Sequence, residues 1–217
     1  MTARERHLAG ADLLAHPISA AVMATIFDRG YAEASVAEFA RRAGIANVEF
    51  ESHFTDKGEA TLRVFEAYID EFVERVGGAY AKVPGWPDNL REAAYETARW
   101  ILDHPAVTWF GMVGVLEAGD MARARRDQVF RWTASLIDAG RTAAPDPGAV
   151  PRSAALMAVG AIAEALRRSQ EDGLEINLAA TLPRMMYAAV RPYLGEDEAR
   201  AELTIPLPAD LQPRGGA

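Results

Sequence analysis

Apolar residues recur every three to four positions along the chain, and no stretch alternates with a period of two for long enough to indicate a strand. In the first predicted helix, Ile18, Val22 and Ile26 lie four residues apart on one face. Pro17 is typical of a first helical turn, and Gly30 is typical of the residue that follows a helix. The pattern therefore predicts an all-α protein of about nine helices.

Two short helices are expected after the first. Ser35 and Glu38 form a capping-box pattern, in which the hydroxyl accepts a backbone N–H and the carboxylate reaches back to the start of the helix. Gly44 ends this second helix, and Asn47 is the expected N-cap of a third helix that extends to about Phe54. A helix, a tight turn and a short helix together indicate a helix-turn-helix.

A longer helix is expected from Asp56, ending or kinking at Gly77-Gly78. Five further helices are predicted over residues 90–102, 106–118, 121–143, 151–171 and 177–194. We therefore expect a helix-turn-helix head over residues 1–60 and a helical ligand-binding and dimerisation domain over residues 61–195. The Pro- and Gly-rich segment over residues 196–217 is expected to be a frayed tail.

Composition excludes several classes of protein. The chain has no cysteine, which rules out disulfides, Cys-ligated zinc, iron–sulfur clusters and thiol nucleophiles. None of the four histidines belongs to an H-E-x-x-H motif, and there is no G-x-S-x-G, so we expect neither an enzyme nor a bound cofactor or metal. The charged N-terminus and the lack of a long apolar run predict a cytoplasmic protein without a signal peptide or membrane contact.

The predicted head contains residues at a recognisable spacing: Ala20-Ala21, Ile26-Phe27, Gly30-Tyr31, Ser35-Val36, Phe39–Ile45, Phe50, His53-Phe54, Asp56-Lys57 and Phe65. At these positions, residues 18–65 resemble the TetR family of transcriptional repressors. The resemblance implies a homodimer that binds operator DNA with its third helix in the major groove and is released by a small-molecule effector. It implies DNA contacts from Ser35, Asn47, Val48, His53 and Lys57.

The charge and four residues depart from that pattern. The family usually has a small hydroxyl residue where Ala46 stands, often Gly-Thr at Val48-Glu49, and Tyr at Glu51. Glu49 and Glu51 place two carboxylates on the third helix. Residues 1–60 contain six basic and nine acidic residues, so the head shares the acidic balance of the whole chain, whose net charge is −8. An alternative is therefore a TetR-fold ligand-binding or protein-interaction module without sequence-specific DNA binding.

The body contains the residues expected to bind an effector, which are Tyr95, Trp100, Trp109, Phe110, Glu117 and Met157. Apolar walls with few polar anchors are typical of such sites, although the same side chains also suit an ordinary core. Gly111 and Gly114 indicate that another helix or a ligand approaches closely. The last two long helices have wide apolar faces rich in small residues, which favour a homodimer interface; the alternative is packing within one subunit.

Overall fold

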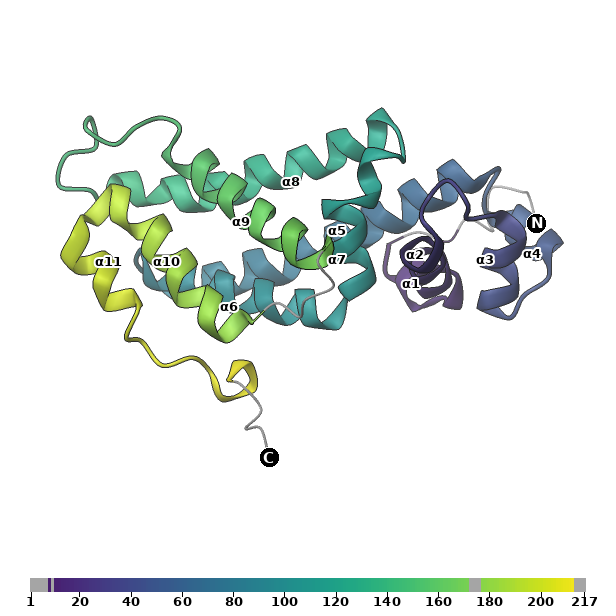
Figure 1. The fold of residues 1–217 in the computed structure, drawn as a ribbon, viewed down its shortest axis with the longest axis horizontal. Coiled ribbons are helices and arrows are strands. Elements are labelled where there is room, and N and C mark those ends of the chain that lie inside the picture. Colours follow the sequence, from purple (N-terminus) through teal and green to yellow (C-terminus); the bar gives the residue numbers. More distant parts are fainter. Residues whose placement is uncertain (1–7, 9, 172–176, 213–217) are drawn as a thin grey trace. The chain divides into compact units, whose positions relative to one another are not determined.

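The computed structural model describes residues 8, 10–171 and 177–212, and all regular structure in these residues is helical (Figure 1). This confirms the all-α fold class, with eleven α-helices in the described residues where about nine were expected. The chain divides into two compact units: unit 1 comprises residues 1–72 and 104–127, and unit 2 comprises residues 73–103 and 128–217. Two of the divisions lie within α5 (Lys57–Lys82) and α8 (Asp120–Asp138), and the third follows residue 103.

Unit 1 is organised around α2 (Pro17–Arg29), which contacts α1 (Gly10–Ala15), α3 (Val36–Ala43) and α7 (Pro105–Met112). Helix α4 (Asn47–His53) packs against α3. The large side chains that are fully buried in this unit are Leu13, Ile18, Val22, Met23, Ile26, Phe39, Phe50, Phe54, Val64, Phe65, Phe110 and Val115. They come from α1 to α5, from α7 and from residues 54 and 115, so each of these helices contributes to the buried interior of unit 1.

The predicted helix ends of the head are confirmed in part. The Ser35 hydroxyl accepts the backbone N–H of Glu38 at 3.4 Å, and Gly44 ends α3 in the left-handed conformation at φ 73°. The Glu38 carboxylate, however, pairs with Arg29 at 2.8 Å. Asn47 does not cap α4: it is the first helical residue, and Ala46 occupies the N-cap position without a side-chain hydrogen bond. The first turn of α4 therefore lacks a side-chain cap.

The expected break at Gly77-Gly78 is wrong, because α5 continues to Lys82. A methyl group on Gly77 would lie 3.6 Å from the Trp132 ring of α8. This glycine therefore lies inside α5 and faces a neighbouring helix. The expected helix over residues 106–118 is instead divided into α7 and a short 3₁₀ helix, η2 (Gly114–Leu116). A methyl group on Gly114 would lie 2.8 Å from the ring of Trp109. The close neighbour of this glycine is therefore a side chain of the same protein.

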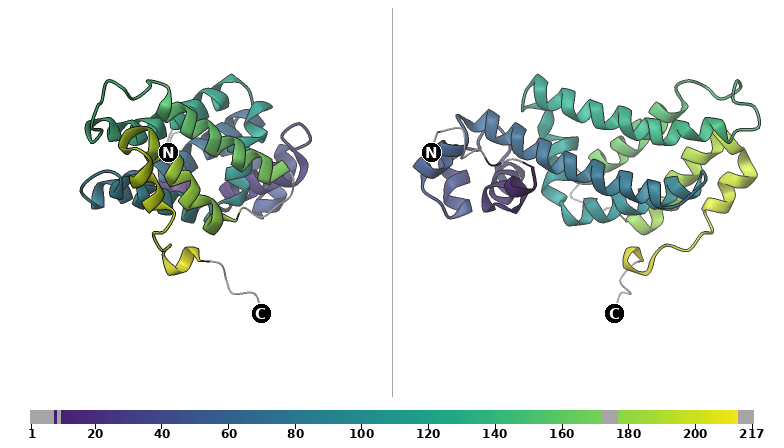
Figure 2. Two further views of the ribbon diagram at one scale, coloured as in Figure 1. Left: turned by 60° about the vertical axis from the view of Figure 1, so that its left-hand side comes forward. Right: turned by 180° about the vertical axis from the view of Figure 1, so that it is seen from behind.

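Unit 2 contains α6 (Asp88–Asp103), the second half of α8, η3 (Ala139–Thr142), α9 (Ala154–Glu171) and α10 (Leu178–Leu194). Helix α10 contacts both α6 and α9, and the left view of Figure 2 shows the two green helices α9 and α10 beside each other. Asn177 caps α10 by accepting the N–H of Ala180 at 3.0 Å, and the helix continues through Pro183. The core of this unit is therefore formed between α10 and its neighbours.

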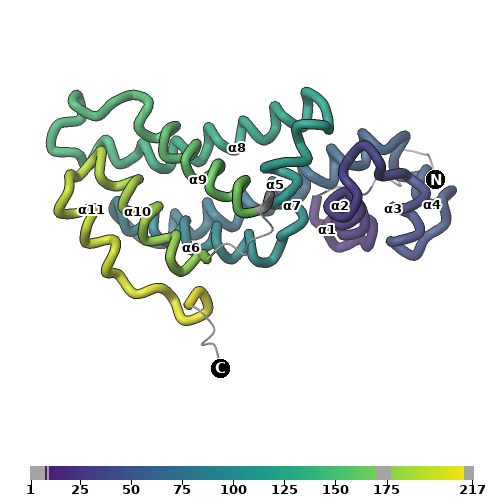
Figure 3. Tube along the Cα trace, viewed as in Figure 1, coloured from purple at the N-terminus to yellow at the C-terminus, as the bar shows by residue number. Residues whose placement is uncertain are grey.

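The segment from residue 196, expected to be frayed, is ordered as far as residue 212. Figure 3 follows the chain from α10 through α11 (Glu196–Glu202) to the short 3₁₀ helix η4 (Ala209–Leu211). Ala199 is fully buried, and Leu211 packs with Tyr95 of α6. This segment is therefore part of the core of unit 2, and the expectation of a frayed tail is wrong for residues 196–212.

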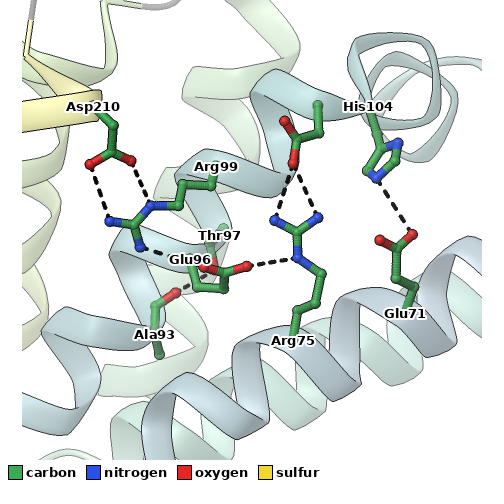
Figure 4. A network of polar contacts seen from close by, with 9 residues as sticks. Glu71, Arg75, Ala93, Glu96, Thr97, Arg99, His104 and Asp210 are labelled. Carbon is green, nitrogen blue, oxygen red and sulfur yellow. Dashed lines mark hydrogen bonds and ion pairs between the residues drawn. The ribbon is translucent and has the colours of Figure 1, made fainter.

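Arginine pairs connect the surface of α6 to other parts of unit 2 (Figure 4). Arg75 of α5 donates to Glu96 at 2.7 Å and to Asp103 at 3.1 Å, while Arg99 donates to Asp210 of η4 at 2.7 Å. These partly exposed pairs fix side-chain geometry more than they add stability. None of the described helices is long and apolar enough to cross a membrane.

Candidate nucleic-acid interface and effector residues

Helices α3 and α4 are joined by a tight turn and held together by aromatic side chains. Phe39 of α3 and Phe50 of α4 are both fully buried, with ring centroids 5.9 Å apart. Phe54, which follows α4, packs on Phe50 at 5.1 Å. The backbone N–H of Ile45 donates to the carbonyl of Ala40 at 3.0 Å, which closes the turn after α3. These contacts form the helix-turn-helix that the sequence predicts.

The outer face of α4 is exposed. Asn47, Val48, Glu49, Glu51 and Ser52 are all exposed, and Val48 retains 74% of its accessible surface. An exposed Val side chain adds little to the stability of the fold, because apolar side chains stabilise a protein mainly when they are buried. A face of this kind, on a helix anchored by two phenylalanines, is suited to insertion into a groove.

Lys57 is held by the loop between α2 and α3. Its ammonium donates to the carbonyls of Tyr31 at 2.8 Å and Ala32 at 3.2 Å, and it lies 4.5 Å from the centroid of the Tyr31 ring. A lysine ammonium has three protons, and two of them are used in these hydrogen bonds within the head. Lys57 therefore anchors this loop in addition to the phosphate contact that the resemblance implies.

The acids of the head differ in how their charge is balanced. Asp28 pairs with Arg42, and Glu38 pairs with Arg29. Among the residues that the structure describes, Glu49 and Glu51 have no ion-pair partner. Their charge is thus carried on the exposed face of α4, where it opposes the approach of phosphate.

Sequence reasoning missed His16, which is the N-cap of α2 and accepts the N–H of Ile18 at 3.3 Å. Its ring centroid lies 5.8 Å from that of His53 at the end of α4. Metal-binding motifs in a sequence are recognised by ligands that lie a few residues apart. His16 and His53 are far apart along the chain and become neighbours only in the folded protein.

The six residues expected to bind an effector are divided between the units: Trp109, Phe110 and Glu117 belong to unit 1, and Tyr95, Trp100 and Met157 belong to unit 2. Phe110 is fully buried against Phe65, with ring centroids 5.0 Å apart. Glu117 and Met157 are exposed. Within each unit, the buried members of the set therefore pack as core residues.

Tyr95 and Trp100 are buried on α6. Tyr95 packs with Leu178 and Leu182 of α10, and burial raises the pKa of its hydroxyl. Trp109 of unit 1 meets Phe27 edge to face, with ring centroids 5.7 Å apart. An effector role for these side chains stays a prediction.

No protein-family model and no curated protein matches the sequence of this chain. Three solved structures of regulators are similar in fold. The fatty acid degradation regulator FadR from Bacillus halodurans has a TM-score of 0.71 and 16% identity, covering 83% of this chain and 95% of that one. FadR from Bacillus subtilis, solved in complex with stearoyl-CoA, has a TM-score of 0.71 and 16% identity, covering 81% of this chain and 97% of that one.

The third structure is described as a TetR family transcription regulator from Shewanella sp. PV-4. Its TM-score is 0.55 at 16% identity, with coverage of 72% of this chain and 82% of that one. The similarity extends over most of the chain in each case. The chain therefore has the fold of the TetR-type transcription regulators.

Proposed function

We propose that this protein is a cytoplasmic TetR-like transcriptional regulator that binds operator DNA as a homodimer and is released by a small-molecule effector. The observation that carries the proposal is the α3–α4 helix-turn-helix, in which Phe39 and Phe50 fix an α4 whose outer face is exposed. In this proposal residues 1–60 form the DNA-binding head, and residues 61–195 bind the effector and form the dimer.

The proposed DNA contacts are of two kinds. Asn47 and Val48, in the first turn of α4, approach the edges of bases, while Ser35, His53 and Lys57 approach phosphates. Glu51 lowers affinity through its charge, although a carboxylate is able to accept a hydrogen bond from the N4 amine of cytosine. The expected result is an operator affinity that depends on salt less steeply than that of a regulator with a basic head.

The proposed dimer interface is formed by α9 and α10. The outer surface of α9 includes Leu156 and Met157, which are 55% and 68% exposed, followed by the exposed small residues Gly160 and Ala161. Large apolar side chains beside small ones on one helix allow close contact with a second copy. Replacing Met157 with Glu is expected to shift the protein to monomer in sedimentation equilibrium, and Leu102→Glu on α6 is the control at a similarly exposed residue.

The first effector to test is a long-chain acyl-CoA, because one protein of the same fold was solved with stearoyl-CoA. An effector acts by binding one conformation of the dimer more tightly than another, so the release of DNA is limited by that difference in affinity. Stearoyl-CoA is expected to raise the melting temperature and to displace bound DNA, and coenzyme A without the acyl chain is the control.

The deciding experiment is selection of bound fragments from the source genome, followed by mobility-shift titration of the selected DNA at several salt concentrations. A regulator selects a palindromic sequence and binds it more tightly than random DNA. Glu49 and Glu51, for which the described part of the chain supplies no ion-pair partner, favour a second candidate function, a TetR-fold ligand-binding or protein-interaction module without DNA binding. Failure to retain any fragment at low salt, with the protein folded and dimeric, would support that second candidate.

A further inference from the structure

Three metal-ligating side chains come together where α4 packs beside the start of α2. They are His16, Glu49 and His53, and one ligand atom from each lies within 4.8 Å of the other two. His16 precedes α2, whereas Glu49 and His53 are four residues apart on α4 and therefore share one face of that helix. Two imidazoles and one carboxylate are a known ligand set for zinc, which leaves a fourth position open to water.

The backbone positions of the two histidines are fixed by local contacts. The carbonyl of His53 accepts from the guanidinium of Arg63 at 2.9 Å, and the N–H of His16 donates to the carbonyl of Leu13 at 3.2 Å. Both imidazoles are half-buried, while the Glu49 side chain is exposed. Zinc-ligand bonds of about 2.0–2.2 Å place ligand atoms roughly 3.3 Å apart, so closing the site requires a small movement that the exposed Glu49 is able to supply.

Binding a cation changes a local contact of His16. The Nδ1 atom of His16 accepts the Ile18 N–H, and a cation bound at Nε2 would shift the remaining ring proton to Nδ1. The contact that would be lost is 3.3 Å long, beyond the usual range for an N–H donor, so it is a weak cap. Imidazole nitrogens favour zinc and other transition metals over Mg²⁺, which takes oxygen ligands.

We propose that His16, Glu49 and His53 bind a divalent transition-metal cation, and that this cation raises the affinity of the head for DNA. The second part rests on the proposed function. A bound cation adds two positive charges beside the exposed face of α4, where Glu49 otherwise contributes one negative charge. The cation therefore offsets the charge of both Glu49 and Glu51, which removes the repulsion that this face of α4 otherwise exerts on phosphate.

The first experiment titrates the full chain, cleared of metal with a chelator, with Zn²⁺ in a calorimeter. We expect one Zn²⁺ per chain, and no comparable heat with Mg²⁺. His16→Asn removes a ligand while keeping an N-cap acceptor for α2, and Glu49→Gln removes the carboxylate. Both variants are expected to bind Zn²⁺ at least about tenfold more weakly. Glu51→Gln is the matched control, because it removes a carboxylate from the same helix outside the cluster, and its Zn²⁺ affinity should equal that of the parent.

The second experiment measures DNA affinity with and without Zn²⁺ at fixed salt. We expect Zn²⁺ to tighten binding by about tenfold in the parent and in Glu51→Gln, and to have no effect in Glu49→Gln. Equal Zn²⁺ binding by the parent, His16→Asn and Glu49→Gln would overturn the site. Zn²⁺ binding without a change in DNA affinity would overturn the coupling. A protein that binds Zn²⁺ at this site but never binds DNA would contradict the proposed function and leave the metal site standing.

Discussion

Arg91 of α6 and Glu202 of α11 form a two-point ion pair, with N–O distances of 2.8 and 2.6 Å. The Glu202 side chain is only 3% exposed, and the hydrogen bonds that Arg91 donates to its carboxylate raise the pKa of Arg91. Removing the carboxylate would leave the Arg91 charge half-buried beside Asp88 alone. We expect Glu202→Ala to lower the free energy of unfolding by about 3–5 kcal/mol, measured by urea denaturation.

The matched control for that variant is Asp88→Asn, which removes the exposed partner of the same arginine. Because Asp88 is 60% exposed, the expected loss is below about 1 kcal/mol. An equal effect of the two substitutions would mean that burial does not determine the strength of this pair.

Gly114 is expected to tolerate no side chain. A methyl group there would lie 2.8 Å from the Trp109 ring and 2.9 Å from the Phe110 ring, so we expect Gly114→Ala to cost about 1–3 kcal/mol. In Gly78→Ala the methyl group meets nothing within 4 Å inside α5, and the expected change is a gain of about 0.5–1 kcal/mol. Thermal unfolding of the two variants beside the parent gives the comparison, and a stabilised Gly114→Ala would contradict the close packing around η2.

Lys57 connects the start of α5 to the loop after α2, so Lys57→Ala is expected to affect both folding and DNA binding. Loss of its two hydrogen bonds to Tyr31 and Ala32 should destabilise the protein by about 1–3 kcal/mol. At temperatures where the variant stays folded, its affinity should fall by a similar factor for all DNA sequences. A variant that loses DNA affinity but keeps the stability of the parent would show that the ammonium is free of the loop.

Glu51→Tyr is expected to strengthen binding to DNA, because it removes a charge from the exposed face of α4 and supplies a ring that packs on sugar and phosphate. Titration at two salt concentrations measures the effect. Glu198→Gln in α11, which makes a similar change in net charge within unit 2, is the control. Unchanged affinity in Glu51→Tyr would mean that this face of α4 does not approach the duplex.

Acid should remove a stabilising contribution from Glu59. The backbone N–H and then the hydroxyl of Thr55 donate to its carboxylate, and these bonds hold the pKa of Glu59 below its ordinary value of 4.5. A group with a lowered pKa stabilises the fold above its unfolded pKa, and the contribution disappears as pH falls through the folded value. The loss of stability between pH 6 and pH 3 should therefore be smaller in Glu59→Gln than in the parent, as measured by denaturation at each pH.

Features that depend on neighbouring residues along the chain could be predicted from the sequence. The hydroxyl cap of Ser35 and the left-handed Gly44 follow from local backbone geometry, and both are present. Asp56 likewise caps α5 by accepting the N–H of Glu59 at 2.8 Å, because the pattern needs only residues three positions apart. The exposed face of α4 also follows from local periodicity.

Features that depend on distant residues could not be predicted in this way. The Gly77-Gly78 pair looks like a helix end, but Trp132 packs at Gly77, and the helix continues. Glu202 lies in a segment rich in charge and proline, and its partner Arg91 is far away in the sequence. The cluster of His16, Glu49 and His53 is hidden for the same reason, since His16 precedes α2 and lies far along the chain from the other two.

The order of residues 196–212 bears on how this protein should be handled. Truncating the chain after α10 would remove Leu211 from its place against Tyr95 and leave the guanidinium of Arg91 without its buried counter-ion. Such a shortened protein would expose apolar surface on α6 and would aggregate more readily than the full chain. Truncations that remove any part of residues 196–212 should therefore be avoided.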